Sequence, residues 1–280
     1  MKFERGTGCD ESPFDLRTFS YVPTGAPIKG GSRYNQEDIE DQHKVGICTA
    51  ISLTQQARKA TGIKYSADFQ YLNQKILTGN WDEGSSIFTS LKVAKNIGLL
   101  PESEWTHTTE EDRKLSYAKY IKKLQAIPQA EIDRLKQIAS EYKITAYTKV
   151  PVDRDIMAQA ITDSAAGLLT RYAIGNEWYR KPIEPLRQPA KPISGHAITE
   201  SNFDGDSFRV ANSWGTDWAD KGTAYRLDKD YQPTEAWLVH YGIPPKEVQK
   251  QLDARTTKLA ATVDLLQKVL ELYKQLRNII

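Results

Sequence analysis

The sequence predicts an α+β protein of two lobes, a helical lobe followed by a strand-rich one. Apolar residues recur at helical spacing between residues 48 and 97. From about residue 144 the pattern changes to short β-branched and aromatic runs bounded by Pro, Gly and Asn. The chain has 280 residues, which is enough for one large domain or two small ones. The change of period marks the expected boundary between the lobes.

The helices of the first half are expected at positions with recognisable end signals. Helix 48–61 is expected to stop at Gly62, which suits the left-handed position after a helix. Ser66 is a plausible N-cap for a second helix, and a third is expected over about 86–97. Residues 110–142 indicate two further charged amphipathic helices, broken at the proline between them, whose charges need no explanation beyond a solvated face.

The second half is expected to form strands, with one helix at 153–165. Five runs have the β-rich composition and the turn residues at their ends that are typical of strands, namely 144–150, 167–173, 197–201, 207–211 and 222–227. Residues 202–206 (NFDGD) indicate a hairpin turn. If the hairpin folds about Asp204, paired residues sum to about 408, and His196 lies opposite Asn212, within reach of a side-chain hydrogen bond.

One stretch places a cysteine where it could be reactive. In residues 42–52 (QHKVGICTAIS) a glycine turn delivers Cys48 to the first turn of a helix, and the positive end of the helix dipole favours a thiolate. Most free cysteines are small buried hydrophobes, so the stretch alone does not decide between the two interpretations.

Bulk composition excludes several other classes of function. A net charge of +2 gives no electrostatic argument for nucleic-acid or membrane-surface binding. No window is apolar enough for a membrane helix, and the N-terminus lacks the apolar core of a secretion signal. The two cysteines and four histidines predict neither a disulfide framework nor a metal site, and no cofactor motif is present. We expect a cytoplasmic protein without metal or cofactor, although removal of a secretion signal would fit the same sequence.

Three segments in one order carry a family resemblance. They are QHKVGIC at 42–48, SGHAI at 194–198 and NSWGTDW at 212–218. Together they resemble the papain-like cysteine peptidases, and the resemblance covers about 13–242. The resemblance implies a two-lobed papain-like fold that hydrolyses peptide bonds of a protein or peptide substrate through a thioester.

The resemblance assigns a role to each catalytic position. Cys48 would be the nucleophile, His196 its acid and base, and Asn212 the residue that orients His196. Gln42 would donate a hydrogen bond to the oxyanion. Threonine follows the cysteine where the family usually has tryptophan.

The resemblance also assigns the substrate cleft. Gly84 would let an extended substrate pair with the enzyme backbone. Trp214 would shield the histidine–asparagine hydrogen bond, and Trp218 would wall the side of the leaving group. The expected substrate-binding set is completed by Ser85, Ser86 and Ser194.

Two features lie outside the family pattern. Cys9, in the N-terminal segment 1–14, is the only cysteine that could pair with Cys48, so the segment is expected to cover the cleft and form a redox-sensitive cap. The alternative is an inert cysteine on a frayed end. Residues 246–280 carry a heptad pattern and predict a long amphipathic helix that makes a homodimer, with packing onto its own domain as the rival.

Two other functions compete with a peptidase. An acyl transferase or transglutaminase-like enzyme would use the same nucleophile but usually orients its histidine with aspartate, so Asn212 argues against it. A silent scaffold protein would not need the intact set of Gln42, Cys48, His196 and Asn212.

Overall fold

The computed structural model describes residues 5–13, 15, 20–25, 27–28, 30–179, 185–227, 229 and 231–242. The chain divides into two compact units, residues 1–242 and 243–280, and all described residues belong to the first. The helix expected at 246–280 therefore lies outside the described residues. No helix among the described residues is both long and apolar enough to cross a membrane.

The first half is helical, as predicted. Gly62 adopts a left-handed φ of 77° after the first helix, and the Ser66 hydroxyl accepts a hydrogen bond from the Phe69 N–H of the second. The segment 110–142 differs from expectation at its start, because Glu110–Lys114 forms a 3-10 turn before the first of its two helices. The α-helices of this half are α1 (Cys48–Thr61), α2 (Ala67–Thr78), α3 (Ile87–Asn96), α4 (Tyr117–Gln125) and α5 (Gln129–Ala139).

The second half contains a six-stranded antiparallel sheet in the order β3-β8-β4-β5-β6-β7, with α6 (Arg154–Asp163) packed on it. The Asp153 carboxylate caps α6. The sequence did not predict β8. This strand is buried along most of its length between two neighbours, so its residues do not alternate between polar and apolar. The strands are β3 (Ile144–Val150), β4 (Leu168–Ile174), β5 (Ser194–Phe203), β6 (Ser207–Ala211), β7 (Thr223–Leu227) and β8 (Glu235–Tyr241).

The hairpin β5–β6 forms, but the predicted register is wrong. Thr199 pairs with Ala211, and beyond an irregularity near Ser201 Phe203 pairs with Phe208, so the paired numbers sum to 410 and 411 rather than 408. The extra residue near Ser201 is a β-bulge, which sequence alone does not reveal. Asn212 therefore follows the end of the ladder instead of lying opposite His196 within it.

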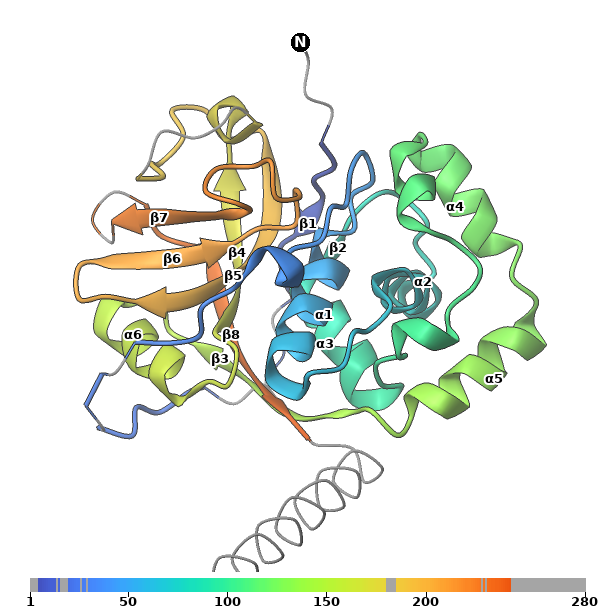
Figure 1. The fold of residues 1–280 in the computed structure, drawn as a ribbon, viewed down its shortest axis with the longest axis horizontal. Helices are drawn as coiled ribbons and strands as arrows, with labels where there is room; N and C mark the ends of the chain where they lie inside the picture. The colour runs from blue at the N-terminus through green and yellow to red at the C-terminus, as the bar shows by residue number, and fades with distance from the viewer. Residues whose placement is uncertain are drawn as a thin grey trace, which may run out of the picture. The chain divides into compact units, whose positions relative to one another are not determined.

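Helix α1 lies against the sheet and joins the two lobes (Figure 1). Leu53 and Ala57 of this helix share an apolar cluster with Leu169 of β4 and Ala197 of β5. The Ser52 hydroxyl adds a hydrogen bond of 2.9 Å to the Ala197 carbonyl. This packing fixes the N-terminal end of α1 beside the middle strands of the sheet.

A fully buried ion pair lies within the sheet. Arg226 of β7 donates from Nε to Glu200 Oε1 on β5 at 2.5 Å, and the Tyr172 hydroxyl of β4 donates to the same oxygen. The guanidinium also lies 4.1 Å from the Phe208 ring centroid. Buried charges of this kind are strongly destabilising when one partner is removed.

Replacing this arginine tests that cost. Arg226→Leu leaves Glu200 buried without its cation, and we expect the free energy of unfolding to fall by about 3–5 kcal/mol in urea denaturation. The double variant Arg226→Leu/Glu200→Leu removes both charges and should recover much of the loss. Equal destabilisation in the single and double variants would contradict this account.

Candidate active site

Cys48 is the first residue of α1 and is fully buried. Its N-cap residue Ile47 makes no side-chain cap, so the free N–H groups of the first turn are directed at the thiol end of the helix. The Gly46 N–H is bound by the Glu83 carboxylate at 2.7 Å, which holds the turn that precedes the cysteine. The position is the one expected from the sequence.

His196 and Asn212 are brought together despite the shifted register. His196 Nε2 lies 2.7 Å from Asn212 Oδ1, which also accepts from the Ser213 N–H at 2.7 Å. His196 Nδ1 is buried and has no hydrogen-bond partner among the described residues, and the imidazole is near enough to Cys48 to lower the pKa of the thiol. The imidazole thus has one nitrogen held by an amide and the other left unbonded.

Tryptophans surround this histidine. The Trp214 ring centroid lies 4.5 Å from that of His196, in the shielding position predicted for it. Trp218 is buried and donates from Nε1 to the Trp178 carbonyl. Its ring packs against that of Trp214. Trp178, whose ring lies 6.4 Å from His196, was not predicted, because its proline-rich surroundings gave no periodic signal.

Gln42 is tied to the loop that carries Asn212. Its backbone N–H donates to the Ser213 carbonyl at 2.9 Å, and its side-chain oxygen accepts from the Ser213 hydroxyl at 2.5 Å. Because the side-chain oxygen of Gln42 accepts from Ser213, the Nε2 of the same amide points the other way and acts as a donor. The predicted oxyanion donor is therefore buried and held in place.

The environment favours a thiolate at Cys48. Burial raises the pKa of Cys48, but hydrogen bonds from Cys9 and His196, the charge of His196 and the Ala197 N–H together hold it well below its ordinary value. Burial and the hydrogen bond to Cys48 raise the pKa of Cys9 well above the ordinary value. Cys9 is thus the protonated thiol of the two, and its Sγ donates to the Asp10 carbonyl at 3.7 Å. Both cysteines are free thiols in this structure.

The N-terminal residues 5–12, which we name the strap, occupy the site. Gln42 Nε2 donates to the Gly6 carbonyl at 2.7 Å, and Trp214 Nε1 donates to the same oxygen at 3.2 Å. The Gly6 N–H donates to the His43 carbonyl at 2.7 Å. A peptide carbonyl of the chain itself therefore takes the donor that an oxyanion would need.

The other end of the strap pairs with the glycine region of the cleft. Strand β1 (Cys9–Asp10) runs parallel to β2 (Ser85–Ser86), and the Ser85 N–H donates to the Gly8 carbonyl at 2.8 Å. The Gly8 N–H donates to the Gly195 carbonyl at 3.2 Å. Neither short strand was predicted, because two residues carry no periodicity.

The predicted substrate residues have unequal positions. Ser85 supplies the backbone donor, whereas Gly84 turns its own N–H and carbonyl inward to Tyr71 and Lys75 and only makes room for the strap. Ser86 caps α3. The Ser194 hydroxyl donates to the Gly195 carbonyl at 3.2 Å, the same oxygen that accepts from the Gly8 N–H.

Arg171 is a strap contact that sequence reasoning missed. Its Nε donates to the Cys9 carbonyl at 2.8 Å, while Nη1 donates to Thr234 Oγ1 at 2.9 Å. The run 167–173 predicted a buried strand, and a lone arginine within such a run is the signal that could have drawn attention to it.

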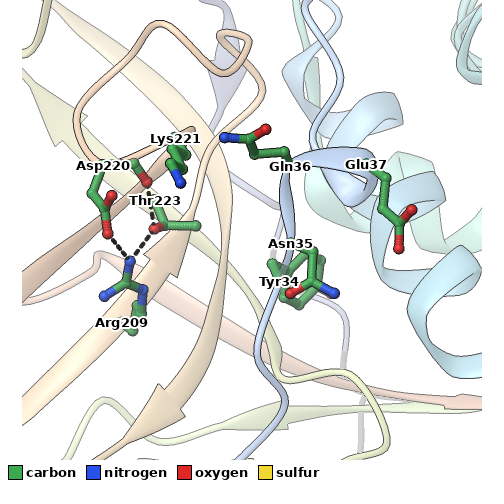
Figure 2. A pocket seen from close by; sticks show the side chains of 8 residues that line it. All are labelled: Tyr34, Asn35, Gln36, Glu37, Arg209, Asp220, Lys221 and Thr223. Carbon is green, nitrogen blue, oxygen red and sulfur yellow. Dashed lines mark hydrogen bonds and ion pairs between the residues drawn. The ribbon is translucent and has the colours of Figure 1, made fainter.

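Two hollows lined by described residues do not include Cys48, His196 or Asn212. One, of about 560 Å³, lies between the 34–37 segment and the turn before β7, where Arg209 is paired with Asp220 and Thr223 (Figure 2). The other, of about 300 Å³, lies beside Asp41 and Asp217. No group of three or more metal-ligating side chains occurs among the described residues. The first hollow is lined by Tyr34, Asn35, Gln36, Glu37, Arg209, Asp220, Lys221 and Thr223.

Solved structures with the same fold are cysteine proteases. Xylellain, a cysteine protease from Xylella fastidiosa, has a TM-score of 0.68 at 22% identity, over 86% of this chain and 97% of that one. Procathepsin B S9 from Trypanosoma congolense has 0.61 at 12%, over 85% and 87%. Digestive procathepsin L 3 of Tenebrio molitor larval midgut has 0.59 at 14%, over 85% and 76%. The fold is therefore the papain-like fold of cysteine proteases, as the sequence predicted.

No family model and no curated protein matches the sequence.

The shifted thiol pKa gives a direct test of the site. Because the pKa of Cys48 is lowered, its thiolate should persist well below pH 8.5, the usual range of a free thiol, in the ultraviolet absorbance of thiolates. Cys9→Ala removes a donor to the sulfur, so the titration midpoint should rise. Cys9→Ser keeps a donor and should shift it less. A Cys48→Ala protein that kept the low-pH signal would refute the assignment.

Proposed function

We propose that this protein is a cysteine peptidase that hydrolyses peptide bonds through a thioester on Cys48. The observation that carries the proposal is the arrangement Cys48–His196–Asn212 beside a fixed Gln42 amide, with the His196 Nε2–Asn212 Oδ1 contact at 2.7 Å. The papain-like fold supports it, since the fold places these residues at the junction of the lobes.

The chemistry follows from these contacts. The Cys48 thiolate attacks the substrate carbonyl, and Gln42 Nε2 donates to the oxygen that becomes negative. His196, held by Asn212, gives its proton to the departing amine and then takes one from the water that hydrolyses the thioester. Trp214 keeps water from the hydrogen bond that orients the imidazole.

We further propose that the strap makes the enzyme latent. The strap uses the same donors that a substrate needs, namely Gln42 Nε2 and the Ser85 N–H. Its path depends on Gly8, which has a φ of 136°, and whose Cβ, if it had one, would lie 2.8 Å from the Gly84 Cα. Any larger residue there would be strained and would clash with backbone.

The two thiols provide a redox control of the same site. A peroxide would oxidise the Cys48 thiolate to a sulfenic acid with release of water. The Cys9 sulfur would then attack it, and a second water would leave as the disulfide forms. The strap would then be bound covalently to the nucleophile, and a dithiol would restore both thiols. The mutual effect of the two thiols supports this step, because each one shifts the pKa of the other.

Labelling with an epoxysuccinyl thiol-peptidase inhibitor tests three parts of the proposal: the reactivity of Cys48, its protection by the strap and its loss on oxidation. We expect one adduct at Cys48 in the intact mass of reduced protein, slow in the wild type and at least about tenfold faster in Gly8→Ala, because the strap is displaced. Peroxide should abolish labelling of the wild type until a dithiol is added.

Three controls separate the parts of this proposal. Cys9→Ala cannot form the disulfide, so its intact mass after peroxide should rise by added oxygen on Cys48, whereas the wild type should lose two hydrogens as the disulfide forms. Equal rates in wild type and Gly8→Ala would contradict latency, and no adduct in any variant would favour the silent scaffold. A peptide mixture cleaved by Gly8→Ala but not by Gly8→Ala/Cys48→Ala completes the test.

We also propose a homodimer through residues 246–280, on the heptad pattern alone. Leucines and other apolar residues recur every seven positions at Leu252, Leu259, Leu266, Tyr273 and Ile280. A variant truncated after Pro245 should sediment as a monomer while the full chain sediments as a dimer. An unchanged oligomeric state would show that this helix is not the dimer interface.

A further inference from the structure

The strap brings one charged side chain into the cleft. The Arg5 guanidinium donates from Nη1 to the Trp214 carbonyl, and its Cζ lies 5.7 Å from the centroid of the Trp214 ring. The Arg5 residue is half-buried there. Guanidinium groups favour this combination of a carbonyl acceptor and an aromatic face.

Two carboxylates act on the same guanidinium through their charge. Burial lowers the pKa of Arg5, and the charges of Asp41 and Asp217 oppose that effect. Asp41 is fixed in place, because its Oδ1 accepts from the His43 N–H at 2.7 Å and its Oδ2 lies 3.5 Å from His43 Nδ1. Asp217 is exposed and lies on the loop after Trp214.

The surface beyond this pair is also acidic. Asp41 and Asp217 line the hollow of about 300 Å³, which has six acidic and three basic side chains. Two of the three basic side chains already form ion pairs. Arg113 pairs with Asp68 and Glu40. Lys64 pairs with Glu102. The acidic side chains lining the hollow are Glu37, Glu40, Asp41, Glu102, Glu110 and Asp217. A cation on the substrate would therefore meet an excess of negative charge.

The position of this pocket relative to the reacting bond follows from the strap. The Gly6 carbonyl occupies the Gln42 donor, where the reacting carbonyl would lie, and the opposite end of the strap pairs with Ser85–Ser86. Arg5 is one residue from Gly6, on the side of Trp214. This is the side on which His196 would deliver a proton to the leaving amine.

We propose that Asp41, Asp217 and the Trp214 ring form a subsite for arginine or lysine within two residues after the scissile bond. The proposal rests on the proposed peptidase function and adds to it a substrate class, namely peptides and proteins with a basic residue on the leaving-group side. In the latent enzyme Arg5 fills the subsite in place of the substrate.

The test compares peptides that differ only in this residue. The peptides are fluorescent and carry arginine, lysine, citrulline or glutamate at the first or second position after the cleavage site. Cleavage by Gly8→Ala protein and binding to Gly8→Ala/Cys48→Ala protein, followed by fluorescence anisotropy, are measured separately. We expect arginine and lysine peptides to be bound and cleaved at least about fivefold better than citrulline peptides, with a smaller preference at about 0.5 M salt.

Charge-matched variants locate the effect. Asp217→Asn should reduce the preference for arginine over citrulline at least about twofold, whereas Asp206→Asn, which removes a charge from the β5–β6 turn, should not change it. Equal binding of arginine and citrulline peptides would overturn the subsite, whether or not they are cleaved. Selective binding without cleavage would keep the subsite and overturn the peptidase.

Discussion

The site depends on a short antiparallel bridge between the two lobes. Asp41 pairs with Trp214, the Gln42 N–H donates to the Ser213 carbonyl, and the Gly215 N–H donates to the Glu40 carbonyl. Because these bonds lie directly before the cysteine turn and directly after Asn212, they set the distance between the Gln42 amide and the asparagine that bonds His196. A shift of either lobe would break backbone hydrogen bonds before it separated the side chains, so the bridge keeps the site assembled.

The close approach of the strap backbone to its neighbours explains the two glycines within it. Gly6 and Gly8 bring backbone within contact of Val45 and Gly84, where no Cβ fits. Backbone atoms of the strap form six of the hydrogen bonds described above, to the Gln42 amide, the Trp214 indole, the His43 carbonyl, the Ser85 N–H, the Gly195 carbonyl and the Arg171 guanidinium. Its hold on the cleft is thus largely independent of side chains, whereas Arg5 and Cys9 add the two specific contacts.

Sequence reasoning recovered what local patterns determine. The ends of α1 and α2 followed from Gly62 and Ser66, and the lobe boundary followed from the change of period. The hairpin register failed because a bulge adds a residue without a sequence signal, and β8 was missed because burial on both faces removes alternation. Cys48, His196 and Asn212 were found through an ordered set of motifs, but Arg171 and Trp178 contact the site only through tertiary packing.

The covalent attachment of the strap to the protein has a consequence for how the proposed latency would respond to concentration. A tethered segment meets its own cleft at an effective concentration that for short flexible connections is of the order of millimolar. Diluting the protein therefore does not release it, and neither does a substrate present at low micromolar levels. Release requires an event that acts on the tether itself, either a cut within it or a competitor that binds the cleft far more tightly than an ordinary substrate. Latency of the proposed kind would thus need no separate inhibitor at any concentration of the protein.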